Sequence, residues 1–178
     1  EEQQEEDEDE DSKKKKEGEG NTITADDYTE PDYEKFKKIK GVEKTAKVYI
    51  TNEAQISVEN KESGTKGQKV TLMGIHTRQF GEITRIPEGL MEKHYHEYLN
   101  ELALNPDGIL VSADFRDVLG YKAGDTVTYC NFQGKQVRGK ILDFVSYWPG
   151  YAPSSMELNP DGSVGHISSL LVIAPIGT

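Results

Sequence analysis

Cysteine is almost absent from this sequence, which contains Cys130 alone. A single cysteine excludes an internal disulfide and any metal site built from several thiolates. Cys130 lies in a run of β-forming residues, so we interpret it as an ordinary strand residue. A catalytic thiolate would need a setting that lowers its pKa, and no neighbouring residue indicates one.

The sequence also lacks an apolar run of about 20 residues, the length that a membrane-spanning helix needs. Its acidic start differs from a secretory signal, which has a basic region followed by an apolar one. We therefore expect no residue of this sequence to span a membrane.

Positive charge is scarce, and the formal net charge is −11. Eleven acidic residues and four lysines within residues 1–20 contribute −7 of it, and the remaining residues contribute −4. This negative balance argues against nucleic acid as a partner, because duplex binding depends on lysine and arginine. Residues 1–22 have almost no apolar surface to offset the entropy of ordering, so we expect a charged segment that is disordered or a linker. Residues 23–178 are expected to fold.

Catalytic motifs are missing as well: neither a nucleotide-binding loop nor a G-x-S-x-G pattern is present. His94 and His96 are two residues apart, so on a helix they point to different faces and cannot form the i, i+4 pair of a zinc helix. His76 and His166 are isolated, and a small hydrolase using either of them is the weakest alternative. We expect no catalytic, cofactor-binding or metal-binding residue, no cofactor and no enzyme activity.

Hydrophobic periodicity predicts an α+β fold. The expected elements are a helix over 32–39, strands over 46–50 and 54–58 joined by a turn at Thr51 and Asn52, a strand over 69–75, a helix over 87–104, a strand over 108–112, a short helix ending at Leu119, strands over 126–131 and 136–148, and a strand over 168–174. The stretch 77–83 is ambiguous. The last strand is apolar throughout, which predicts a central position buried on both faces.

Three motifs between Asn105 and Gly150 resemble a known family. They are N-x-x-G-I-L-V-S at 105–112, L-G-x-K-x-G-D-x-V at 119–127 and V-x-Y-W-P-G at 145–150. Residues 39–48 and 70–75 resemble the start of the same domain more weakly. The sequence is similar in these places to the extracytoplasmic core domain of MacB-like and FtsX-like ABC transporter permeases.

This resemblance implies a porter-like α/β part with a mixed or antiparallel sheet, and a smaller β-rich part carrying the long hairpin 126–148. It allows two interleaved subdomains within residues 23–178. It also implies a domain at the extracytoplasmic face of the bacterial cell membrane, with the membrane helices outside both ends of this sequence. A closed barrel, or an occupied reaction centre lined by histidines and acids, would overturn the interpretation as part of a membrane-embedded machine.

The implied role is non-catalytic: the domain couples ATP-driven motion of membrane helices to a substrate or partner protein. The implied partners are the transmembrane helices of the same permease, indirectly its ATP-binding subunit, and an extracytoplasmic protein or a small-molecule substrate. Any ATPase activity would belong to a separate subunit or domain.

An aromatic group flanks Pro149 and Gly150, where the chain leaves the long hairpin. Tyr147, Trp148 and Tyr151 are the candidate partner-binding residues, because tyrosine and tryptophan in loops often anchor a partner. The alternative is that these rings cap the core. A rival function uses the same residues: a secreted or surface-attached recognition domain that binds a peptide or glycan.

Overall fold

The computed structural model describes residues 32–60, 64–131, 134–158 and 161–176. These residues belong to one compact unit, Asp32–Thr178. The expected boundary between residues 22 and 23 lies outside the described residues. The α+β class is confirmed, because short helices accompany a barrel of six strands.

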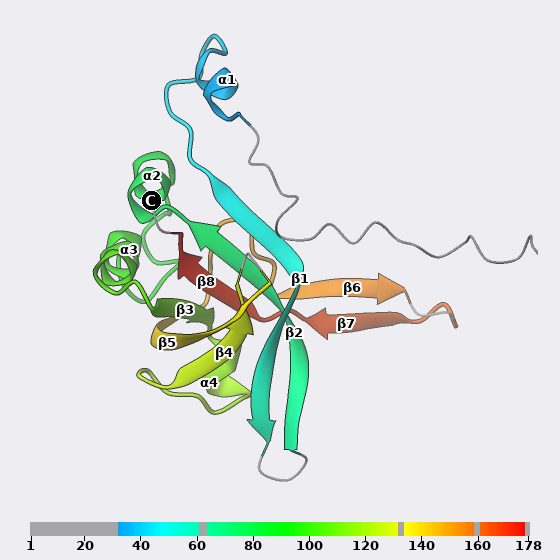
Figure 1. Ribbon diagram of the computed structural model, residues 1–178. Helices are drawn as coiled ribbons and strands as arrows, with labels where there is room; N and C mark the ends of the chain where they lie inside the picture. Colours follow the sequence, from blue (N-terminus) through cyan, green and yellow to red (C-terminus); the bar gives the residue numbers. More distant parts are fainter. Residues whose placement is uncertain (1–31, 61–63, 132–133, 159–160, 177–178) are drawn as a thin grey trace, which may run out of the picture. The chain divides into compact units, whose positions relative to one another are not determined.

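Six strands close into a barrel in the order β1-β2-β8-β3-β5-β4 (Figure 1). Their sheet is mixed: β2 pairs parallel with β8 and β3 parallel with β5, while the other neighbours are antiparallel. A separate antiparallel pair, β6 and β7, extends to one side. The bounds are α1 Glu34–Lys37, β1 Val48–Asn60, β2 Gly64–Ile75, α2 Thr77–Ile83, α3 Tyr95–Leu104, β3 Gly108–Ser112, α4 Asp114–Asp117, β4 Thr126–Cys130, β5 Gln136–Val145, β6 Ser154–Leu158, β7 Val164–Ser168 and β8 Leu171–Pro175.

Successive apolar side chains along the strands belong alternately to two apolar clusters. On β3, Ile109 and Val111 join the cluster to which all six barrel strands contribute, whereas Leu110 joins the other. Because successive strand side chains point to opposite faces, the first cluster fills the barrel. The second lies outside the wall, between the strands and the helices α2 and α3. The predicted burial of the last strand on both faces is confirmed, since β8 contributes to both clusters.

The strand over 46–50 and the strand over 54–58 are in fact one. β1 runs without a turn from Val48 to Asn60, and its register with β2 shifts between Thr51 and Ala54. A β-bulge absorbs extra residues while the strand continues. The turn predicted at Thr51 and Asn52 was therefore wrong, and β1 spans the barrel wall as a single long strand.

The helix expected over 87–104 begins only at Tyr95. His94 has an extended backbone and its Nδ1 accepts a hydrogen bond from the His96 amide at 3.3 Å, so it caps the helix and separates it from residues 87–94. The ambiguous stretch 77–83 forms α2. Strands β6 and β7 were not predicted, and the turn predicted at 159–162 lies partly outside the described residues.

The long hairpin does not form a part of its own. β4 and β5 pair with each other, and they close the barrel by pairing with β1 and β3. The mixed sheet is as expected, but the division into a porter-like part and a β-rich part is corrected to one barrel. Pairing of Ile56 with Tyr129 and of Ser57 with Thr128 closes it.

Candidate functional site

The predicted aromatic group lies in the segment between β5 and β6. The Tyr151 amide donates to the Trp148 carbonyl at 3.1 Å, which closes a turn, and Gly150 adopts a positive φ of 79° within it. Tyr147, Trp148 and Tyr151 are thus close in space, but the structure gives them three different environments.

Trp148 is completely buried in the cluster outside the barrel wall. Its ring stacks on Phe80 of α2, with ring centroids 5.6 Å apart and planes within 3°. Its Nε1 is buried and has no hydrogen-bond partner among the described residues. Trp148 therefore caps the core and fixes α2 against the barrel, as the alternative interpretation held.

Tyr151 is half-buried and its hydroxyl donates to the Ser169 carbonyl at 2.5 Å. Burial raises the pKa of this phenol. Tyr147 is the most accessible of the three residues, with a relative exposure of 40%. Partner binding by these aromatic residues stays a prediction, and Tyr147 is the member of the group that a partner could reach in this structure.

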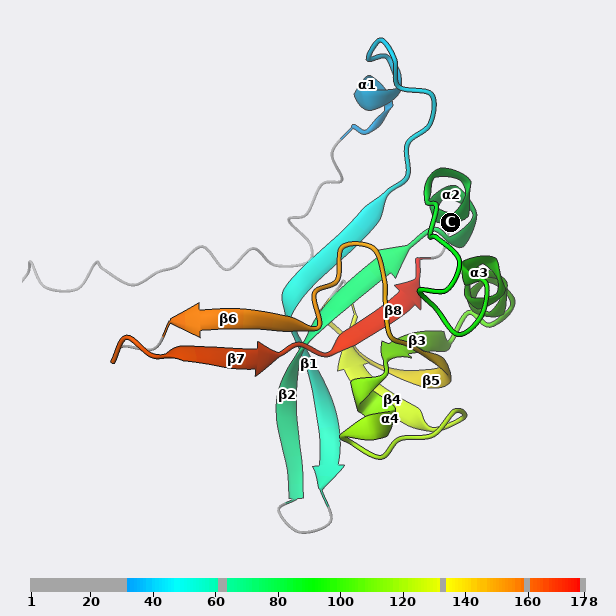
Figure 2. The ribbon, with the colours of Figure 1, turned by 180° about the vertical axis from the view of Figure 1, so that it is seen from behind.

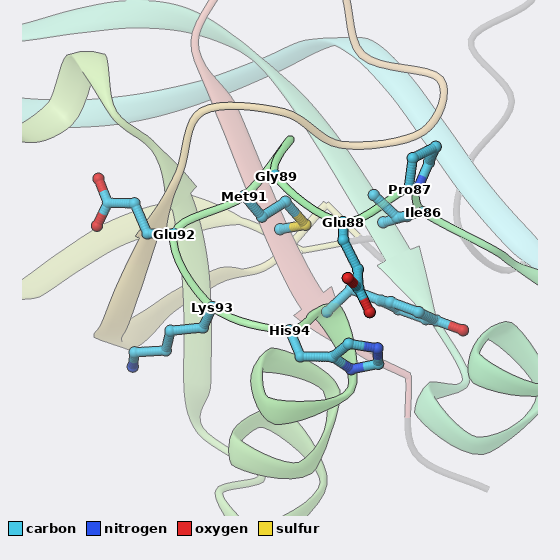
Figure 3. Close-up of a pocket in the computed structure, with 9 residues that line it drawn as sticks. Ile86, Pro87, Glu88, Gly89, Met91, Glu92, Lys93 and His94 are labelled. Carbon is cyan, nitrogen blue, oxygen red and sulfur yellow. The ribbon is translucent and has the colours of Figure 1, made fainter.

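A shallow pocket of about 310 Å³ lies in the loop between α2 and α3 (Figure 3). Ile86, Met91 and Tyr95 in its lining also pack against the outer cluster. The Glu92 and Lys93 side chains point away from His94 in this view.

Lys93 holds this loop to the barrel through ion pairs with Asp143 of β5 and Glu101 of α3. The hydrogen bond to Asp143 is the main cause that raises the pKa of Lys93. Two kinds of contact thus hold the loop: the ion pairs of Lys93, and a hydrogen bond that the Tyr95 hydroxyl donates to the Thr84 carbonyl at 2.6 Å. The pocket has mixed polarity, because its lining also includes Glu88, Glu92, Lys93 and His94.

Among the histidines whose side chains the structure describes, His94 and His96 lie against each other. The rings of His94 and His96 stack at 5.3 Å, but one of the His94 nitrogens is already used in the helix cap. His76 lies at the start of α2, and the side chain of His166 in β7 is outside what the structure describes. No three histidine, cysteine or acidic side chains in the described part of the chain are placed to hold a metal ion.

One surface was missed by the sequence analysis: residues 33–47, which we name the lysine segment. Its apolar residues were identified as one helix face, which would normally pack on a core. In the structure α1 has no buried residue, and Phe36, Ile39 and Val42 are 42%, 53% and 36% exposed. They line a groove of about 390 Å³, whose other lining residues are Tyr33, Thr45, Ala46 and Lys47.

The chain enters and leaves the barrel at the same end. Val48, the first residue of β1, pairs with Ile75 of β2, and Ile75 pairs on its other side with Pro175 of β8. The Ile176 amide then donates to the Ile75 carbonyl at 2.9 Å. Figures 1 and 2 show the start of β1 and the end of β8 on the same side of the barrel as α2.

The sequence matches no protein-family model and no curated protein. Among solved structures it is similar to the extracellular domain of the noncanonical ABC-type transporter YknZ from Gram-positive bacteria. The TM-score is 0.40 at 10% sequence identity, and the match covers 79% of this chain and 59% of that one. This chain thus spans well under two thirds of that structure. Within the described residues, no helix has both the length and the apolar character to cross a bilayer.

Proposed function

We propose that this chain is a non-catalytic extracytoplasmic domain of an ABC transporter permease. One geometric observation carries the proposal: the first residue of β1 and the last of β8 flank the same residue of β2. Two strand spacings place the two connections about 10 Å apart. Packed helices have axes about 8–10 Å apart, which matches this spacing. A membrane helix before this sequence would be separated from β1 by residues 1–47.

The sequence motifs support the same proposal, and the structure shows what they build. The motif at 105–112 forms β3, the motif at 119–127 delivers the chain into β4, and the motif at 145–150 ends β5 and forms the turn at Trp148. The closed barrel is the outcome that we expected to overturn the interpretation as part of a membrane-embedded machine, and it removes the two-part architecture that the resemblance implied. The proposal therefore depends on the motifs and on the paired connections, not on that architecture.

The barrel would act as one rigid body. β1 and β8 are both hydrogen-bonded to β2, so a displacement of either connection moves the whole sheet. A body attached to two helices can pass a change between two helix arrangements to a bound substrate or partner as a change in orientation. ATP hydrolysis would take place in a separate subunit or domain, and the domain itself needs no cofactor.

Extraction of the native membranes tests this function. A permease domain stays in the membrane fraction after an alkaline carbonate wash, because the full-length protein is held by spanning helices, and an ATP-binding protein copurifies with it in mild detergent. Recovery of the full-length protein in the wash or in the culture medium would overturn the proposal.

That contrary result would favour the rival, a secreted or surface-attached domain that recognises a peptide or glycan. The exposed ring of Tyr147 is the observation that favours it. A recognition domain would need Tyr147 to bind its peptide or glycan. A permease would stay in the membrane fraction without Tyr147.

A further inference from the structure

The lysine segment combines positive charge with exposed apolar side chains. Residues 33–47 contain six lysines and two glutamates, giving +4 in a chain of net charge −11. Lys37 is paired with Glu34 and Lys44 with Glu82. Among the described residues, Lys35, Lys38 and Lys40 have no carboxylate partner.

The segment lies where the chain enters the barrel, and it is attached to the body. Besides the Lys44–Glu82 ion pair at 3.3 Å, the Lys47 amide donates to the Gln79 side-chain carbonyl at 3.5 Å, so both contacts are to α2. Lys47 also lies 4.9 Å from the centre of the Tyr33 ring. These contacts leave the groove open, and Figures 1 and 2 show α1 beyond the start of β1.

We propose that the lysine segment docks on an anionic lipid surface. Lysines attract anionic head groups, while apolar side chains at the same site enter the boundary between head groups and acyl chains. Phe36, Ile39 and Val42 supply the apolar part, and the unpaired lysines supply the charge. This inference rests on the proposed function, which places this end of the barrel towards a bilayer.

The charge pattern of the chain argues against its own acidic segment as the occupant. Residues 1–20 carry −7 and could attract the lysines, but residues 1–22 contain no apolar side chain to cover Phe36 and Ile39. A lipid surface satisfies both features of the groove. Docking of the lysine segment on the lipid surface would tilt the barrel towards the membrane, and it would reduce the range of orientations that the barrel can adopt.

Vesicle sedimentation with the whole 178-residue chain tests the proposal. We expect binding to vesicles of phosphatidylglycerol mixed with phosphatidylcholine, weaker binding to phosphatidylcholine alone, and a decline as salt is added. The double variant Lys38→Glu and Lys40→Glu should lower the affinity by on the order of tenfold or more, because each lysine near an anionic surface contributes substantially. Phe36→Ser with Ile39→Ser should weaken binding at every salt concentration.

The matched control is Lys122→Glu with Lys135→Glu, two exposed lysines outside the lysine segment. Its charge change equals that of the first variant, so it separates a local site from overall charge. All three variants should keep the thermal unfolding temperature, since every substituted residue is exposed. Absence of binding, or equal losses in the control and the Lys38 variant, would overturn the proposal.

A crosslink from residue 38 to another membrane protein, with no vesicle binding, would also overturn it and assign the groove to a protein partner. Failure of vesicle binding would leave the membrane extraction result unchanged, so the lipid site and the permease function are tested separately.

Discussion

Trp148 offers the sharpest test of how the candidate aromatic site is built, through the substitution Trp148→Ala. A buried aromatic side chain of this class removes about 150–250 Å² from water. At about 25 cal/mol per Å² this corresponds to about 4–6 kcal/mol as an upper bound. Measured truncations of buried tryptophan cost about 3–5 kcal/mol in the free energy of unfolding.

We therefore expect a loss of about 3–5 kcal/mol in the free energy of unfolding, and a fall of on the order of 10 °C in the unfolding temperature for a domain of this size. Tyr147→Ala, on an exposed ring, should change stability by less than about 0.5 kcal/mol.

Urea unfolding followed by circular dichroism measures both variants. The native protein adds a direct check, because Trp148 is its only tryptophan. Its fluorescence should resist soluble quenchers in the folded state and become sensitive to them on unfolding. If Trp148→Ala costs under about 1 kcal/mol, or the folded protein is quenched as readily as the unfolded one, the ring is not part of the core and our description of this site is wrong.

Three further outcomes follow from the structure. Gly139→Ala should cost about 1–3 kcal/mol by urea unfolding, because a Cβ there would lie 2.7 Å from the Ile109 Cγ2 inside the barrel. The same substitution should cost less in a protein that already carries Ile109→Ala, and equal costs in the two backgrounds would contradict a filled barrel. The free energy of unfolding should fall as the pH rises above about 10. The folded state raises the pKa of Lys93 and of the Tyr129 phenol, so it keeps protons that the unfolded chain has already released. Urea unfolding at a series of pH values measures this, and a flat profile would refute it. Tyr151→Phe should lower stability by about 0.5–1.5 kcal/mol, because the bond to the Ser169 carbonyl is lost, and an unchanged urea midpoint would show that this bond contributes nothing.

Local pattern was enough to predict the strands that are apolar or strictly alternating. The runs that became β3 and β8 were identified because both faces of each strand are buried. The interruption at Thr51 and Asn52 was misinterpreted, since a bulge and a turn use similar polar residues and only the partner strand distinguishes them.

Barrel closure was beyond the sequence for a different reason. It depends on the pairing of Ile56 with Tyr129 and Ser57 with Thr128, which joins segments far apart in the chain. Hydrophobic periodicity within a strand does not indicate which two edge strands pair to close the sheet. The same alternating strands would be compatible with an open sheet.

The candidate site shows the same limit. The aromatic residues were found from composition, but the burial of Trp148 depends on Phe80, which lies in a segment whose structure the sequence left ambiguous. The lysine segment was identified as amphipathic, and its exposed apolar face became visible only when α1 was found to pack on nothing.

The gene on both sides of this segment provides the most direct test of the central claim, that the barrel is held at both ends by membrane helices. We predict an apolar stretch of about 20 residues upstream and another downstream, with an ATP-binding domain encoded in the same gene or beside it. A coding sequence without a membrane helix on either side would contradict the claim.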